Sequence, residues 1–149
     1  MKRLLERAWP WIAALIVSAA WARSGKPMPA DADTLFGTAA TVASIFASFL
    51  GVAQAIIIGL REGPVYKVLE EGKLLSLLFG YLQAAIFSSV AFAGLSILGF
   101  FLPVGEVAQN RVVEIFMIIW VAAGALALFT FFRITQLFFR LLNQEESSF

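Results

Sequence analysis

The sequence predicts an all-α integral membrane protein with four transmembrane helices per subunit, both termini in the cytoplasm, and subunits assembled as a homo-oligomeric bundle. Three observations predict this fold. Of the 149 residues, 60% are hydrophobic and 14% are charged, whereas an average soluble domain is about 45–50% apolar and about 25% charged. Four stretches of the chain are almost free of charge, and the basic residues between them are concentrated in alternate segments.

The four apolar stretches run over residues 8–22, 35–60, 74–102 and 112–132. A helix needs about 20 predominantly apolar residues to cross a hydrocarbon core of about 30 Å. The second, third and fourth stretches reach that length. At about 1.5 Å per residue the second and third are about 39 Å and about 43 Å long, so we expect them to tilt or to extend beyond the core.

The first stretch is short, and residues 1–22 also have the pattern of a signal peptide. The residues that fit a basic segment and an A-x-A cleavage site are Lys2, Arg3, Arg7 and Ala20-Trp21-Ala22. Against cleavage, tryptophans bracket the stretch as interfacial anchors bracket a span. They are Trp9, Trp11 and Trp21. We therefore predict that residues 8–22 form an uncleaved first span.

The basic residues set the orientation. With four spans, the N-terminal segment, the middle loop and the C-terminal segment share one side of the membrane and hold eight of the 11 Lys and Arg residues. The other side holds Arg23, Lys26 and Arg111. By the positive-inside rule, both termini face the cytoplasm.

Two cytoplasmic segments are candidates for contact with a protein partner. Pro64 is suited to begin a short helix and Gly72 to end it, so residues 64–71 form either an interfacial helix on the membrane or a capped connector. Beyond Phe132, polar residues recur at spacings of 3, 4 and 3. This predicts an amphipathic cytoplasmic tail over residues 133–149, acting as a surface anchor or a docking site. The candidate docking residues are Val65, Val68, Leu69 and Arg140.

The second span carries its small and weakly polar residues on one face. At about 100° per residue these positions fall within an arc of about 80°. They are Gly37, Thr41, Ser44, Ser48, Gly51, Ala55 and Gly59. Two interpretations are open. The face packs closely against another helix, or copies of it surround an axis and line a wetted path, with the hydroxyls and the Gln54 amide replacing part of an ion's hydration shell.

The third span has a weaker face of the same kind. It contains Ser76, Gly80, Gln83, Ala84, Ala91 and Gly94. In an antiparallel hairpin, Gln54 and Gln83 lie about 10 Å and about 15 Å from the cytoplasmic ends of their helices. Because an unpaired amide in the membrane costs several kcal/mol, we expect each to have a partner, within or between subunits. They act as polar interhelical contacts or as a selectivity ring.

Three charged residues flank the fourth span. Arg111 and Glu114 lie one turn apart and can pair, and Arg133 lies about 28 Å further along the helix from Glu114. Each is expected at a membrane interface, where none is well placed to relay protons.

Composition excludes several classes of function. Without His or Cys, the chain lacks the ligands and nucleophiles of the usual zinc, iron–sulfur, thiol and His-based catalytic sites. We therefore predict no enzyme activity and no cofactor or metal. A net charge of +1 argues against nucleic acid as a partner. The expected partners are membrane lipid, further copies of the chain and a cytoplasmic protein, because no loop is long enough to form a domain.

The organisation as a whole matches a known pattern. A basic segment precedes the first span, residues 34–59 are rich in Ser, Thr and Gly, a short charged loop reaches Gly72, and residues 142–146 form a polar tail that contains Glu. In these respects the chain resembles the small four-span membrane proteins of phage-exclusion systems, the RexB-like proteins. The resemblance implies an ion-conducting pore that depolarises the bacterial inner membrane when a cytoplasmic partner senses infection.

The leading hypothesis is therefore an oligomeric inner-membrane pore or depolarising effector in antiviral defence by abortive infection, gated by a cytoplasmic partner. One alternative is a non-conducting scaffold or membrane anchor that recruits a soluble partner. A second is a holin-like lesion that passes large proteins. Transport of an organic substrate ranks last, because no inverted repeat or broken helix with a charged site is apparent.

Overall fold

The computed structural model describes residues 2–25, 31–59, 74–102 and 111–146, with side chains over residues 8–25, 31–59, 75–102 and 111–138. These residues form α1 (Lys2–Arg23), α2 (Ala32–Gly59), α4 (Leu74–Gly99) and α5 (Arg111–Glu146). The predicted interfacial segment 64–71, with its docking residues Val65, Val68 and Leu69, lies outside the described residues. So does the side chain of Arg140.

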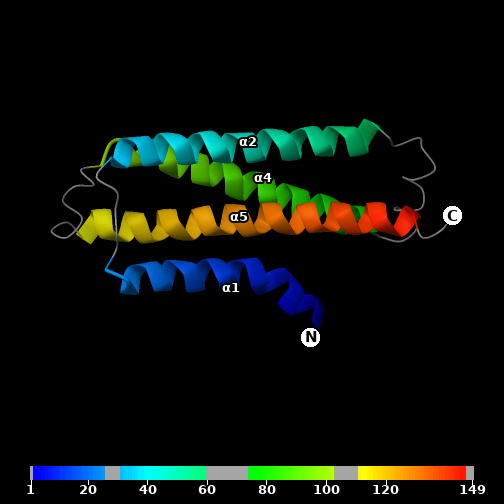
Figure 1. Ribbon diagram of the computed structural model, residues 1–149, viewed down its shortest axis with the longest axis horizontal. Helices are drawn as coiled ribbons and strands as arrows, with labels where there is room; N and C mark the ends of the chain where they lie inside the picture. The colour runs from blue at the N-terminus through cyan, green and yellow to red at the C-terminus, as the bar shows by residue number, and fades with distance from the viewer. Residues whose placement is uncertain (1, 26–30, 60–73, 103–110, 147–149) are drawn as a thin grey trace.

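Successive helices run in opposite directions along the long axis of the molecule (Figure 1). The main contacts join α2 to α4, α4 to α5, and α5 to α1, with a smaller contact between α2 and α5. The helices therefore form an open row, in which α1 and α2 lie on opposite sides of α4 and α5. We call the end where α1 and α4 finish and α2 and α5 begin the Arg111 end.

Three of the helices are long and apolar enough to cross a membrane: Ala32–Gly59, Leu75–Gly99 and Arg111–Phe138. This confirms the all-helical prediction and three of its membrane-length segments. The predicted tail is helical as far as Glu146 and continues α5 without a break. The fourth predicted segment, residues 8–22, falls in α1, which has 22 residues. Because α1 also includes Lys2, Arg3, Glu6 and Arg7, it is less apolar than residues 8–22 alone.

Local hydrogen bonds explain where the helices begin and end. Asp31 caps α2, since its carboxylate accepts from the Thr34 backbone N–H at 3.1 Å and from the Thr34 hydroxyl at 2.6 Å. These bonds, the hydroxyl bond first, hold the pKa of the Asp31 carboxyl below its usual value. This cap starts α2 at Ala32 rather than at the predicted residue 35. After α1, Gly25 adopts a φ of 87° that ends the helix.

Two clusters of buried side chains hold the row together. The first lies near the Arg111 end and contains Phe36, Val113, Met117 and Trp120. The second lies towards the opposite end and contains Leu50, Leu78, Leu82, Ala85 and Ile134. On α2 the buried residues are seven apart, at Phe36, Ala43 and Leu50. This spacing keeps one side of α2 against α4 and α5 along much of its length.

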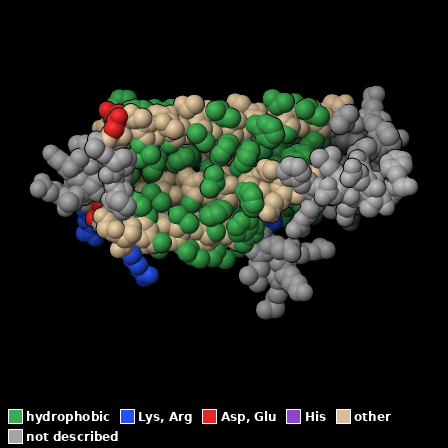
Figure 2. Space-filling model, in the orientation of Figure 1, with side chains coloured by type: hydrophobic (Ala, Val, Ile, Leu, Met, Phe, Trp, Pro, Cys, Tyr) green, Lys and Arg blue, Asp and Glu red, His purple; other side chains and the backbone are tan. Residues whose placement is uncertain are grey.

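The outer surface of the described helices is apolar. Large hydrophobic side chains are exposed on all four helices, for example Leu15 at 67%, Ile45 at 60%, Phe87 at 63% and Val112 at 68%. They cover the middle of the molecule in Figure 2, whereas most of the charged side chains in view lie near the Arg111 end. Apolar surface of this extent is unfavourable in water and favourable in lipid. The fold is that of a membrane protein.

Candidate functional site

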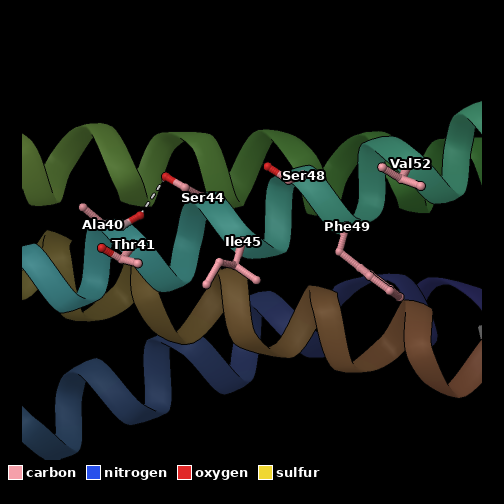
Figure 3. Close-up of a pocket in the computed structure, with 7 residues that line it drawn as sticks. All are labelled: Ala40, Thr41, Ser44, Ile45, Ser48, Phe49 and Val52. Atoms are coloured by element: carbon pink, nitrogen blue, oxygen red, sulfur yellow. Dashed lines mark hydrogen bonds between the residues drawn. The ribbon is translucent and has the colours of Figure 1, made fainter.

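The small-residue face of α2 lies on the outside of the subunit. Thr41, Ser44 and Ser48 are exposed, as are Ala55 and Gly59. Gly37, Gly51 and Gln54 are partly buried. Seven exposed or partly exposed residues line a shallow depression along this helix: Ala40, Thr41, Ser44, Ile45, Ser48, Phe49 and Val52 (Figure 3). Because all of them belong to α2, the depression is an open surface and not an enclosed cavity.

The small face points away from α5. Phe46 stacks on Phe131 of α5 with ring centroids 4.2 Å apart. Ser44 and Ser48 are each two residues from Phe46, which places them about 160° from it around the helix. Contacts with α5 therefore leave this face uncovered.

Much of the matching face of α4 lies on the same side of the α2–α4 pair. All six of its predicted residues are exposed: Ser76, Gly80, Gln83, Ala84, Ala91 and Gly94. Tyr81 and Phe92 pack against residues of α5. Gln83 and Gly94 each follow one of them by two residues, so they also point away from α5. Ala84 and Ala91 lie nearer to the side of Ser88, which bonds to Thr130 of α5. The small face of α2 and Ser76, Gly80, Gln83 and Gly94 of α4 form one outer surface, which we call the α2–α4 small surface.

Two hydroxyls on this surface bond to their own helix. Thr41 Oγ1 donates to the Gly37 carbonyl at 2.9 Å, and Ser44 Oγ donates to the Ala40 carbonyl at 2.8 Å. The second bond is the dashed line in Figure 3. A hydroxyl that donates in this way keeps its oxygen lone pairs as acceptors. Thr41 and Ser44 thus present acceptor oxygens without leaving their own hydroxyl donors unsatisfied in lipid.

The glycines on this surface are not required by packing within the subunit. A Cβ built on Gly51, Gly59, Gly80 or Gly94 meets no heavy atom within 4 Å. A Cβ on Gly99 would lie 2.7 Å from the Phe36 ring, and one on Gly124 would lie 2.8 Å from the Phe92 ring. The buried glycines therefore allow helices of one subunit to approach each other, whereas the exposed glycines have no such role inside the chain.

The two glutamines do not pair within the subunit. Gln54 is partly buried on α2 and Gln83 is exposed on α4, and no hydrogen bond joins them in the described chain. Pairing between subunits stays a prediction.

Three other polar contacts hold the helices together, and the sequence did not indicate them. Trp120 Nε1 donates to Ser96 Oγ at 3.0 Å, and Ser88 and Thr130 share a hydrogen bond of 2.9 Å. Ser18 Oγ donates to the Ile118 carbonyl at 3.1 Å and thereby joins α1 to α5. Helical spacing could have indicated the buried serines, because Leu82, Ser89 and Ser96 repeat every seven residues along the buried side of α4.

Two of the flanking charges, Arg111 and Glu114, lie in the first turn of α5, whereas Arg133 lies within the helix. Arg111 is exposed and Glu114 is partly buried in the first turn, where an acidic side chain suits the helix dipole. Arg133 is partly buried and lies over the Tyr81 ring, 4.0 Å from its centroid. Among the described residues, no three His, Cys, Asp or Glu side chains form a group that could hold a metal ion.

No protein-family model, curated protein or solved structure matches this chain. Its site is therefore interpreted from its own geometry.

Proposed function

We propose that the protein is a homo-oligomeric pore of the bacterial inner membrane, in which the α2–α4 small surfaces of neighbouring subunits meet and line an ion pathway. The observation that carries the proposal is the outward position of this surface. Most of its hydroxyls, the Gln83 amide and three of its glycines, Gly59, Gly80 and Gly94, are exposed on the outside of the subunit, so another molecule can cover them.

A second copy of the chain suits this surface. Lipid provides no hydrophobic drive for helix association, so helices associate through close packing and hydrogen bonds. Small residues allow two helix backbones to approach closely, which increases dispersion contacts and allows interhelical hydrogen bonds. Glycine in a helix is less stable than alanine by up to about 1 kcal/mol in water. Four glycines with open space beside their Cα atoms are explained by a close neighbour outside the subunit.

The acceptor oxygens favour a cation as the conducted ion. With their protons donated to backbone carbonyls, Thr41 and Ser44 present lone pairs towards the proposed axis. Oxygen acceptors can replace part of a cation's hydration shell, as carbonyl oxygens do in cation channels. A pathway of this kind would depolarise the membrane without any catalytic group.

The proposed topology has four spans with both termini in the cytoplasm. Helix α1 packs antiparallel along α5, from the Trp9–Phe129 ring contact at 5.7 Å to the Ser18–Ile118 hydrogen bond. Its 22 residues give a length of about 33 Å, which is enough to cross the core. With eight of 11 basic residues on the side of the termini, the Arg111 end faces the periplasm.

Ion flux from proteoliposomes tests the function. We expect Ser44→Leu and Ser48→Leu each to reduce cation flux at least tenfold, because a bulky apolar side chain dewets a narrow path. Val42→Leu is the matched control, since Val42 is exposed about 160° around α2 from Ser44. Equal flux from all three variants, or no flux from the wild-type protein with and without a cell extract, would overturn the proposal.

A non-conducting scaffold is the second candidate. The bonding of Thr41 and Ser44 to their own helix favours it, because such hydroxyls need no water. In that case the small surface only joins subunits, and the cytoplasmic segments recruit a soluble partner. A stable oligomer that binds a stoichiometric cytoplasmic protein and passes no ion would support the scaffold. Passage of large proteins would instead indicate a holin-like lesion.

We propose that the pore acts in phage defence. Only the arrangement of segments along the sequence supports this role. Cells that express the protein should lose membrane potential after infection and before phage release. Cells with Ser48→Leu should keep their potential and release phage.

A further inference from the structure

Arg133 is a charged residue within the apolar part of α5, far from the Arg111 end. Its guanidinium carbon lies 4.0 Å from the centroid of the Tyr81 ring on α4. A guanidinium over an aromatic face is attracted to the ring's negative quadrupole, and its planar group can stack on the ring. Both side chains are partly buried. The contact therefore holds the guanidinium of α5 against α4 instead of leaving it to move freely.

The depth of this pair corresponds to a membrane boundary. At about 1.5 Å per residue, Arg133 lies about 33 Å from Arg111 along α5, and Tyr81 lies about 27 Å from Gly99 along α4. Both distances are close to the thickness of a hydrocarbon core, about 30 Å. If Arg111 and Gly99 mark one boundary, Arg133 and Tyr81 lie at the headgroup level of the opposite leaflet.

The guanidinium lacks a carboxylate neighbour among the side chains that the structure describes. The acidic residues of that set are Asp31, Asp33 and Glu114, and all belong to the Arg111 end. Glu114 is about 28 Å from Arg133 along the helix. The Tyr81 ring attracts the cation but accepts none of the guanidinium's in-plane N–H bonds. An anionic acceptor at this depth is available from the membrane itself.

We propose that Arg133 binds the phosphate of a phospholipid headgroup, with Tyr81 as the positioning residue. The planar guanidinium can donate two parallel N–H bonds to two phosphate oxygens, an arrangement that lysine cannot provide. Gln136 is exposed one turn further along α5 and adds an amide donor on the same face. The lipid would lie against α4 and α5, on the opposite side of the α2–α4 pair from the small surface. The site is independent of the proposed pore.

Native mass spectrometry of the full-length protein tests this binding, with phosphatidylglycerol added to the purified protein in detergent. We expect Arg133→Gln to reduce the bound lipid about tenfold, as the loss of a charge-assisted pair implies. Arg133→Lys keeps the charge and should give an intermediate value. Tyr81→Phe should bind like wild type because the ring remains, whereas Tyr81→Leu should bind less. Arg111→Gln, at the other end of the span, is the control and should be unchanged.

Two further measurements identify the source of the phosphate and verify the fold of each variant. Inorganic phosphate at millimolar concentration should not displace the lipid, since the acyl chains add to its binding. Circular dichroism should show the same helix content in every variant. The proposal is wrong if folded Arg133→Gln retains lipid like wild type, if Arg111→Gln loses as much, or if inorganic phosphate alone displaces the lipid.

Discussion

Among the glycines that the structure describes, Gly99 leaves the least room for an added methyl group. An alanine Cβ there would lie 2.7 Å from two atoms of the Phe36 ring and 2.8 Å from a third. Carbon atoms pack at about 3.5–4.0 Å, so the ring must retreat by about 1 Å. It has no room to do so, because Phe36 is fully buried and contacts the rings of Phe100, Phe116 and Trp120.

We therefore expect Gly99→Ala to lower the free energy of unfolding by about 1–3 kcal/mol, the usual effect of overpacking a core. The higher helix propensity of alanine offsets part of this, by less than about 1 kcal/mol. Gly94→Ala in the same helix is the matched control in the dissociated subunit, since its Cβ meets nothing within 4 Å inside the chain. Unfolding by SDS in mixed micelles, followed by circular dichroism, measures both.

A second-site change sharpens this test. Phe36→Leu removes part of the ring, so Gly99→Ala should be less damaging in its presence than alone, with a coupling energy of about 1 kcal/mol or more. The packing argument is refuted if Gly99→Ala is as stable as wild type, if Gly94→Ala is equally destabilised, or if the two substitutions at 36 and 99 act additively.

Three further predictions concern hydrogen bonds. Ser96→Ala leaves the buried Trp120 indole N–H without its acceptor and should cost about 1–3 kcal/mol, whereas Ser44→Ala in the same SDS titration should cost less than about 0.5 kcal/mol. Ser88→Ala and Thr130→Val should each cost only about 0.6 kcal/mol, because both hydroxyls also bond to their own helices, and the double variant should show coupling. Asp31→Ala should speed amide exchange at Thr34. Because the pKa of Asp31 is lowered in the folded protein, wild-type protection of the Thr34 amide should be complete above the ordinary pKa of 3.8 and be lost as pH falls through the folded pKa. Asp31→Asn should lack that pH dependence.

Hydropathy and periodicity were sufficient to predict the helices but not to predict which helices pack against each other. The apolar stretches predicted α2, α4 and α5 because a run of that length can satisfy its backbone in lipid only as a helix. The order of the row was not predictable, because it depends on which sides fit together. Phe36 against Gly99 and Phe92 against Gly124 are ring-into-glycine contacts between distant residues, and no pattern within one helix indicates such a pair.

The sequence predicted which small residues share a face of one helix, but not that residues of α2 and α4 form one surface. Helical spacing grouped Thr41, Ser44 and Ser48, and all three are exposed, since exposure follows the same 100° rotation. The prediction that Gln54 and Gln83 supply polar contacts between spans missed the serines that do so within the subunit, Ser88 and Ser96. Serine is common on both sides of membrane helices, so its role depends on the partner that the fold brings to it.

Thiol labelling tests the central claim, that the α2–α4 small surface lines a wetted path, most directly. The chain has no cysteine, so each single-cysteine variant carries one thiol. In the assembled protein in membranes, Ser44→Cys should react with a charged, membrane-impermeant thiosulfonate and reduce cation flux when modified. Val42→Cys, about 3 Å along the axis and about 160° around the helix, should face lipid or protein and stay unreactive. Reaction at Val42→Cys with none at Ser44→Cys, or disulfide cross-linking at Ser44→Cys without any labelling, would contradict the pathway.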